Sequence, residues 1–258
     1  KSAPLTSINV VPKLKIISPL QVRGGVMDEI NDVYAFIIGP EQRNMHKFVY
    51  SLQKSGLIIR MSQSEIDVTN DNKVKIFRRG SIIVPVHNQV INASEIIKMM
   101  DIKGKEFDIK IHVMNTGNGT NTITAGHPLV TSLEKPEIAF IVGNGINPQS
   151  AGEVWHHTDL NLSIPATLLD ITRLRNTNLK RYNTIILPEG NFNVWGESEI
   201  NKLKEWCQQG NTLITIGSAT DWAADKKLVS LNLRKTDRNY SGSGIYENAD
   251  REIDAKVI

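Results

Sequence analysis

The sequence lacks most of what several common kinds of site require. It has a single cysteine in 258 residues, which excludes an intrachain disulfide and every multi-cysteine metal site. No apolar run approaches the roughly 18 residues that a membrane-spanning helix needs. Lysine and arginine form no dense run: the closest is Arg78-Arg79, and the formal net charge is only +3. A nucleic-acid interface needs a basic stripe or cluster, so we expect no nucleic-acid partner.

The composition that remains is that of a globular protein. Hydrophobic residues make up 40% and charged residues 22%, which argues against disorder and supplies one large core or two smaller ones. The first ten residues contain neither an initiator Met nor the hydrophobic core of a signal peptide, and the last five form a β-like run. We therefore expect this sequence to be a piece of a longer protein.

Short apolar runs alternate with amphipathic stretches along the chain. Strands are predicted at 33–38, 57–61, 73–77, 81–86 and 107–113 in the first half, and at 138–142, 165–169, 184–187 and 212–216 in the second. Helices are predicted at about 45–55, from Asn92, at 150–159, at 198–209 and through 222–224. Asn92 and Glu95 have the spacing of a capping box. Residues 115–126 and 237–249 read as loops.

This alternation is typical of an α/β protein with right-handed crossovers and a mostly parallel sheet. We expect a lead-in over 1–31, a smaller α/β lobe over 32–135 and a second α/β lobe over 136–258. In such sheets ligands bind beyond the carboxyl ends of the strands. A ligand cleft is therefore predicted there, lined by Asn144, Gly145, Glu153, His156, Glu189, Gly190 and Ser218.

The run GEVWHH at 152–157 has two readings. Glu153 and His156 share a helix face and could act as an acid/base pair or as metal ligands. Alternatively, Glu153 completes a capping box with Ser150 while Trp155 packs. In that case Glu153→Ala should cost about 1 kcal/mol of stability. We favour the cap, and the two readings can coexist.

Ser218 also has two readings, because it follows a strand and precedes a helix, as a nucleophile does in a strand–turn–helix elbow. It could act with His156 or His157 and a carboxylate from Glu153 or Glu189. However, the second glycine of G-x-S-x-G is missing, and Ser218 and Asp221 have the spacing of a helix N-cap. We favour the cap over the nucleophile.

The remaining candidates are weaker. Cys207 lies on the apolar face of a predicted helix and is expected to be a buried, unreactive thiol. The six histidines form no His-Glu-x-x-His or His-x-x-Glu pattern, so we expect no zinc site. The glycine-rich pieces at 117–120 and 143–145 match no phosphate-binding signature and are expected to be turns.

Residues 136–228 resemble the class I glutamine amidotransferase-like domain found at the C-terminus of large bacterial zinc carboxypeptidases related to carboxypeptidase A. The resemblance is carried by PEIAFIVGNG, SAGEVWHHTD, IPATLLDITRL, LKRYNTIILPEGNF and INKLKEWCQQGNTLITIGSATDWA, and by the closing DREIDAKVI. The stretch from YAFIIGPEQ to FRRGSIIVPV is similar to the segment that precedes that domain. The resemblance thus covers most of residues 30–258.

This resemblance implies a flavodoxin-like second lobe and a parent zinc carboxypeptidase exported to the periplasm or outside the cell. Zinc would be held by an upstream domain in the same polypeptide, and this chain would have no cofactor. A working amidotransferase has a cysteine at the elbow and a later His-x-Glu pair. Here the elbow reads Gly217-Ser218-Ala219, and no histidine follows His157. Both departures argue against glutaminase activity.

The sequence therefore favours a non-catalytic accessory region that stabilises or positions a carboxypeptidase domain, or binds a peptide or glycan. The first alternative is a Ser218-dependent hydrolase or transferase at the strand-end cleft. The second is a dimerisation or docking module, including a homodimer, which an apolar surface patch of more than a few hundred Å² would indicate.

Overall fold

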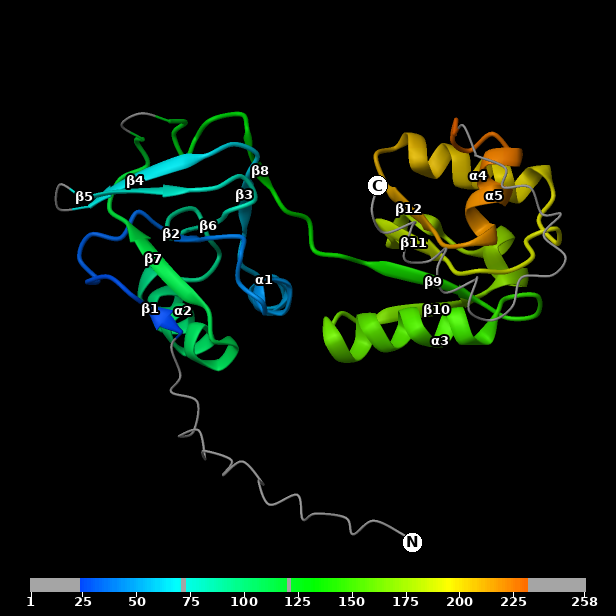
Figure 1. Cartoon of the computed structure of the whole chain (residues 1–258), viewed down its shortest axis with the longest axis horizontal. Helices are drawn as coiled ribbons and strands as arrows, with labels where there is room; N and C mark the ends of the chain where they lie inside the picture. The colour runs from blue at the N-terminus through cyan, green and yellow to red at the C-terminus, as the bar shows by residue number, and fades with distance from the viewer. Residues whose placement is uncertain (1–23, 71–72, 120–121, 232–258) are drawn as a thin grey trace, which may run out of the picture. The chain divides into compact units, whose positions relative to one another are not determined.

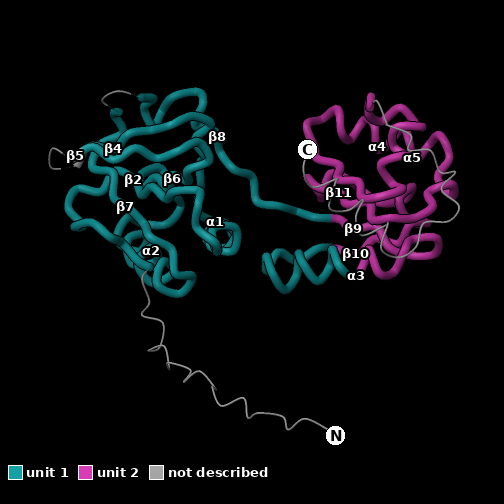
Figure 2. Tube along the Cα trace, in the orientation of Figure 1, with its two compact units in different colours: residues 1–138, 153–166 teal, residues 139–152, 167–258 magenta. Residues whose placement is uncertain are grey.

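The computed structural model describes residues 24–70, 73–119 and 122–231, and its fold is mixed α/β. The chain forms two compact units (Figure 2): unit 1 comprises Lys1–Ile138 and Glu153–Ala166, and unit 2 comprises Ala139–Gly152 and Thr167–Ile258. Most of the predicted lead-in, the predicted loop at 237–249 and the closing DREIDAKVI lie outside the described residues.

The part of unit 1 that precedes β9 (Ile138–Val142) contains two helices and eight strands (Figure 1) among its described residues. The helices are α1 (Met45–Lys54) and α2 (Ala93–Phe107). The strands are β1 (Gly25–Val26), β2 (Ala35–Ile38), β3 (Arg60–Ser62), β4 (Ile66–Asn70), β5 (Lys73–Phe77), β6 (Ile82–Pro85), β7 (Lys110–Met114) and β8 (Val130–Ser132). Strands β1, β4 and β8 were not predicted, and α2 extends through Phe107, where a strand was predicted to begin.

The main sheet of unit 1 has the order β1-β7-β2-β6-β3-β8. Strand β2 runs antiparallel to both β6 and β7, and β3 runs antiparallel to both β6 and β8. Only β1 and β7 pair in parallel among the neighbours whose direction is defined. The expectation of a mostly parallel sheet is therefore wrong for this unit, because strand–helix alternation fixes the order of elements in the chain but not their directions in space.

Both faces of this sheet are buried, and the side chains alternate between them. Phe36 and Ile38 of β2 pack with α1 and α2, whereas Ala35 and Ile37 pack with the β4/β5 hairpin. Figure 1 shows the two helices on one side of the sheet and the hairpin on the other. Two buried faces explain why β2 reads as a continuous apolar run, and each fully buried side chain contributes roughly 1.5–3 kcal/mol.

The start of α2 confirms the Asn92 half of the predicted capping box. The Asn92 side chain accepts a hydrogen bond from the Glu95 backbone N–H at 3.0 Å. This bond satisfies one of the backbone donors that the first turn of a helix leaves without an intrahelical partner. At its other end, α2 closes with Asp108 in the left-handed conformation, at φ 54°.

Unit 2 is built on a four-stranded sheet of order β10-β9-β11-β12, in which β11 and β12 are parallel. The strands are β9 (Ile138–Val142), β10 (Ala166–Asp170), β11 (Thr184–Leu187) and β12 (Thr212–Thr215). The helices from α3 onward are α3 (Pro148–His156), α4 (Glu197–Gln208) and α5 (Ser218–Asp225), with 3-10 turns at Ile171–Asn176 and Leu179–Arg181. The second half of α3 and the π-helical turn His157–Asn161 that continues it belong to unit 1. The strands at 138–142 and 184–187 match the predicted bounds.

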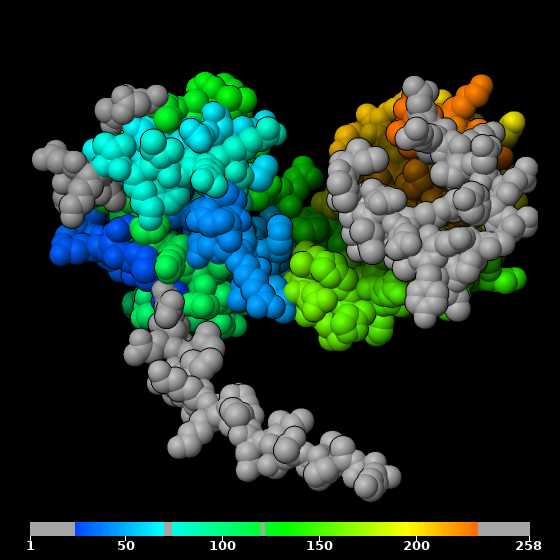
Figure 3. Space-filling model, in the orientation of Figure 1, coloured from blue at the N-terminus to red at the C-terminus, as the bar shows by residue number. Residues whose placement is uncertain are grey.

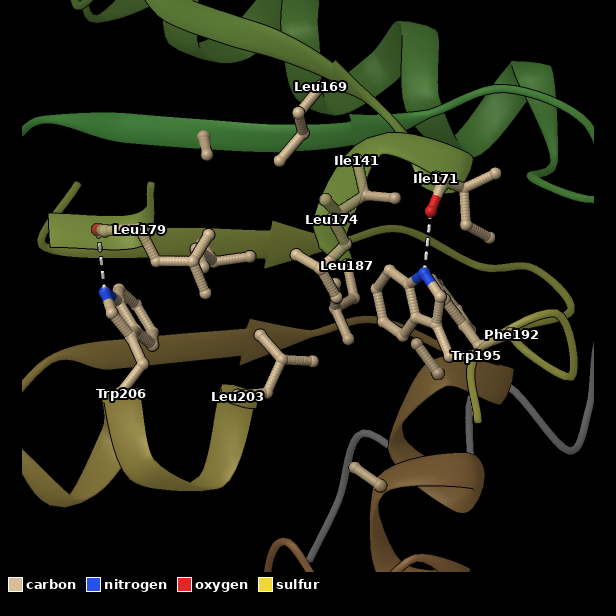
Figure 4. Close-up of a cluster of buried hydrophobic side chains, with 14 of the residues drawn as sticks. Ile141, Leu169, Ile171, Leu174, Leu179, Leu187, Phe192, Trp195, Leu203 and Trp206 are labelled. Atoms are coloured by element: carbon tan, nitrogen blue, oxygen red, sulfur yellow. Dashed lines mark hydrogen bonds between the residues drawn. The ribbon is translucent and has the colours of Figure 1, made fainter. Parts of the chain in front are cut away.

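Tryptophans connect α4 and the loop before it to the core of unit 2 (Figure 4). The Trp206 indole N–H reaches the carbonyls of Leu179 and Tyr182, each at 3.1 Å, while Trp195 donates to the Ile171 carbonyl at 2.7 Å. These bonds avoid the cost of an unpaired buried donor, about 1–3 kcal/mol. Both tryptophans therefore anchor turns that carry no regular strand pairing.

Lys202 of α4 also anchors a turn of unit 2, through its charged ammonium group. Its Nζ donates to the carbonyls of Leu174, Arg175 and Thr177 at 3.0, 2.7 and 2.6 Å, where the 3-10 turn Ile171–Asn176 ends. The Leu174 carbonyl also accepts from the Thr177 backbone N–H at 3.3 Å. A cation at the carbonyl end of a turn is favourable. One side chain thus closes the connection between β10 and β11.

We expect Lys202→Met to lower the free energy of unfolding by about 1–3 kcal/mol, because hydrogen bonds to a charged donor are lost while the aliphatic stem is kept. Lys204→Met is the matched control, since Lys204 is exposed on the same helix. Urea denaturation measures both variants. Equal midpoints for the two would contradict the role given to Lys202.

Candidate functional site

The four strands of unit 2 bring their carboxyl ends to one edge. An amino-acid side chain at Gly143, after β9, would meet the Asp170 carboxylate at the end of β10 at 3.0 Å. The loops after β9 and β11 are joined by the Asn191 N–H, which donates to the Gly145 carbonyl at 2.8 Å. Asp170, which was not predicted, holds two hydrogen bonds from Thr172, and these lower the pKa of its carboxyl.

Ser218 lies at this edge, but not in the role predicted for it. It is the first residue of α5, and the N-cap residue is Gly217. The Ser218 hydroxyl instead accepts from the Gly190 N–H and donates to the Gly190 carbonyl, each at 3.1 Å. The predicted N-cap is therefore wrong: this hydroxyl joins the loops after β11 and β12.

Gly217 occupies the sharp turn between β12 and α5. Its φ is 57° and its ψ is −130°, a conformation that side-chain-bearing residues rarely adopt. In a nucleophile elbow the reactive residue itself holds the strained position between strand and helix. Here a glycine, which has no side chain, holds that position. A Cβ atom at Gly217 would lie 3.4 Å from Glu189, an ordinary van der Waals contact, so the backbone conformation rather than crowding favours glycine.

The loop after β11 is fastened to the start of α3. Asn147 donates from its backbone N–H to the Glu189 carbonyl at 2.8 Å and from its amide to the Glu189 carboxylate at 3.1 Å. The Ser150 hydroxyl accepts from the Glu189 N–H at 3.2 Å. The predicted cleft residues Asn144, Gly145, Glu189, Gly190 and Ser218 thus share one edge, and most of its polar groups bind one another.

The same contacts correct the start of α3. The helix begins at Pro148, not Ser150, and the Asn147 side chain accepts from the backbone N–H groups of Gln149 and Ser150 at 2.9 and 3.3 Å. Asn147 is therefore the capping residue, followed by proline at the first helical position, where its missing N–H costs nothing. The predicted Ser150–Glu153 cap is wrong.

Glu153, His156 and His157 are exposed on the second half of α3 and its continuation. They belong to unit 1, whereas Ser218 and Glu189 belong to unit 2. In the described part of the chain the Ser218 hydroxyl bonds to Gly190 and to no imidazole. Trp155 is 48% exposed, so the expectation that it packs is also wrong.

Cys207 is half-buried against the core of unit 2 rather than fully buried. Burial raises the pKa of its thiol above the usual value. Since the thiolate is the reactive form, this environment disfavours nucleophilic chemistry.

A second group of polar side chains lies in unit 1 and was not predicted as a site. His112 of β7 directs Nδ1 to the Asp28 carboxylate at 3.0 Å, and its Nε2 lies 2.6 Å from the Lys75 ammonium of β5. Because an ammonium can only donate, this arrangement requires a neutral imidazole with its proton on Nδ1. The Asp28 carboxylate also accepts from the Val113 N–H at 2.8 Å.

The electrostatics agree with a neutral His112. Burial lowers its pKa below the ordinary value of 6.5, and the nearby charge of Lys75 lowers it further. Asp28 acts in the opposite direction, and Lys110 adds to the lowering. The side chain packs on Phe77 with ring centroids 5.5 Å apart, so the hairpin supplies both its charge partner and its cover.

No protein-family model, curated protein or solved structure matches this chain. Within residues 24–70, 73–119 and 122–231, no group of three or more His, Cys, Asp or Glu side chains could hold a metal ion. No helix in those ranges is long and apolar enough to cross a membrane.

We expect Asn147→Ala to lower the free energy of unfolding by about 1 kcal/mol, because the cap of α3 is lost. Asn147→Ser should recover most of the loss, since a hydroxyl can accept the same bonds. Asn144→Ala, at an exposed position in the same loop, is the control. An equal loss in Asn144→Ala would argue against the cap.

We also expect His112 to make stability depend on pH. Its folded pKa lies below 6.5, so the unfolded chain binds this proton more readily and stability falls as pH drops through that value. In His112→Asn the loss on acidification should be smaller. Urea midpoints on either side of the ordinary histidine pKa measure it, with exposed His46→Asn as the control. The idea fails if both variants keep the full dependence.

Proposed function

We propose that this chain is a non-catalytic accessory region of a larger exported protein, and that its second unit is a flavodoxin-like, class I glutamine amidotransferase-like domain without nucleophile chemistry. The carrying observation is the strained strand–helix turn after β12, where Gly217 stands in place of a reactive residue. Ser218 follows it, and its hydroxyl is hydrogen-bonded to the backbone N–H and carbonyl of Gly190.

The strand order of unit 2 supports the flavodoxin-like part of the proposal. The order β10-β9-β11-β12 corresponds to 2-1-3-4, the first four positions of the flavodoxin-like order 2-1-3-4-5. The parallel pairing of β11 with β12 and the meeting of all four strand ends at one edge agree with it. In such a sheet an active elbow would lie at that edge, where the Gly217 turn is found.

The hydrogen bonds at this edge support an accessory role over catalysis. A serine nucleophile needs a base within hydrogen-bond reach to accept its proton. The Ser218 hydroxyl directs its proton to the Gly190 carbonyl, which cannot serve as a base. Glu189 is likewise engaged by the Asn147 amide. Ser218 and Glu189, the groups that acyl transfer would require, instead form hydrogen bonds that join three loops.

The parent protein is proposed from the resemblance of residues 136–228 to the domain that follows the peptidase in zinc carboxypeptidases. In that setting zinc and the peptidase chemistry belong to an upstream domain of the same polypeptide. The role left to this region is to stabilise or position that domain. Binding of a peptide or glycan at the strand ends has less support, because the polar groups there already bind one another.

A fluorophosphonate probe, which labels activated serines, tests the non-catalytic reading. We expect no labelling of the folded chain above the level of Ser218→Ala, because no base activates this hydroxyl. Labelling that Ser218→Ala abolishes would refute the proposal and favour the hydrolase alternative. An active serine hydrolase, labelled in parallel, shows that the probe is competent.

A second experiment concerns the parent. The full-length protein should contain zinc and release C-terminal residues from peptides, and Ser218→Ala should leave that rate unchanged. A full-length protein without zinc or carboxypeptidase activity would remove the parent assignment. That result would not affect the separate conclusion that no nucleophile stands at Gly217.

A further inference from the structure

Unit 1 contains a cavity of about 580 Å³. It opens between β5, the first half of β7 and the turn that joins β2 to α1. Figure 3 shows the β4/β5 hairpin at the surface of this unit. The cavity is lined by Gly39, Glu41, Gln42, Lys75, Ile76, Phe77, Arg78, Lys110 and His112. Its volume is in the range of small-molecule sites, roughly 300–1,000 Å³.

The lining is rich in positive charge. Lys75, Arg78 and Lys110 contribute three cations, and Glu41 is the only acidic side chain of the lining. With His112 neutral, the formal charge of the walls is +2, three cations less one carboxylate. Within the ranges that the structure describes, none of the three cations forms an ion pair. Like charges in excess of the single carboxylate repel one another, so a bound anion would stabilise this wall.

Lys75 is held in place rather than left to move freely. Its ammonium donates to His112 Nε2 at 2.6 Å and lies 5.2 Å from the centre of the Phe77 ring. His112 is fixed in turn by Asp28 at 3.0 Å. The series of contacts Asp28–His112–Lys75 therefore fixes the position of one cation. Because the Lys75 side chain is already ordered, less conformational entropy is lost when a ligand binds to it.

The strand that carries Lys110 is fixed in a similar way. The Gln42 amide donates to the Lys110 carbonyl at 2.9 Å, and its oxygen accepts from the Lys110 N–H at 2.6 Å. Gln42 thus takes the place of a neighbouring strand just beyond the Ile37–His112 pair of β2 and β7. Two walls of the cavity are consequently rigid at the positions where their cations project.

We propose that this cavity binds the oxyanion group, phosphate or carboxylate, of a small organic ligand. Arg78 offers a planar fork that can bind two oxygens, and Lys75 and Lys110 supply further donors. The cavity is much larger than one such group, and the exposed side chain of Ile76 gives part of its wall an apolar surface. The ligand therefore carries an organic body besides its anionic group. This proposal does not depend on the function proposed above.

Titration of the intact chain with inorganic phosphate and, separately, with acetate tests it by NMR chemical shifts or calorimetry. At a pH above the ordinary histidine value, we expect saturable binding of at least one anion. Phosphate alone would indicate an organic phosphate, and acetate alone an organic carboxylate. If neither anion saturates a site that includes Lys75 and Lys110, the proposal is overturned.

Two matched variants separate the cavity from general surface charge. Arg78→Gln should weaken binding about tenfold, because a charge-assisted hydrogen bond to the anion is lost. Arg79→Gln removes the same charge from the adjacent residue, which is exposed and does not line the cavity, and should leave the affinity unchanged. Equal weakening by both variants would overturn the site as well. Both substitutions are on exposed side chains, so neither threatens folding.

Discussion

The burial of both faces of the unit 1 sheet is the constraint from which the rest of that unit follows. Along β7, Ile111 and Val113 face the helices, while the alternate residues Lys110 and His112 face the hairpin side. At the centre of that side the hairpin covers Ala35 and Ile37 with apolar residues. Where its cover ends, a histidine must be half-buried, and it is accommodated only because Asp28 and Lys75 satisfy both ring nitrogens. The basic cavity thus lies on the hairpin side of the sheet, next to the apolar cluster that the hairpin covers.

Unit 2 meets a different constraint at its strand ends. Four strands stop at one edge, and the backbone groups of their loops need partners there. They find them in each other: Gly190 pairs with the Ser218 hydroxyl, and Asn147 with Glu189. Such a network needs a sharp exit from β12, and Gly217 provides it at φ 57°. Ser218 and Glu189, which the sequence offered as candidates for catalysis, are thus among the residues that hold the fold together at this edge.

Sequence reasoning succeeded where one local signal decides the structure. The apolar runs at 138–142 and 184–187 gave strands with the right bounds, and Asn92 gave a correct helix cap. It failed where two local signals compete: Ser150 and Ser218 both have cap spacing, but Asn147 and Gly217 hold those positions. The Asn147-Pro148 pair was the available signal for the first. Strand direction was missed because neither the hydrophobic period nor the order of elements along the chain says which strands pair. The consecutive strands β5 and β6, for example, belong to different sheets.

The basic cavity shows a further limit of reading charge along the chain. A net charge of +3 and the lack of a lysine or arginine run led us to expect no nucleic-acid interface, but they say nothing about how charges are concentrated in space. Lys75 and Lys110 lie 35 positions apart in the sequence, from 75 to 110, and reach one cavity because β5 packs across β7. The only hint was alternation, since Lys110-x-His112 places two polar side chains on one face of an otherwise apolar strand. Basic residues at alternate positions of a strand can pair with carboxylates, remain solvated, or bind an anionic ligand. Here His112 positions Lys75 at the cavity, and none of the three cations forms an ion pair in the described ranges, so all three can bind an anion there.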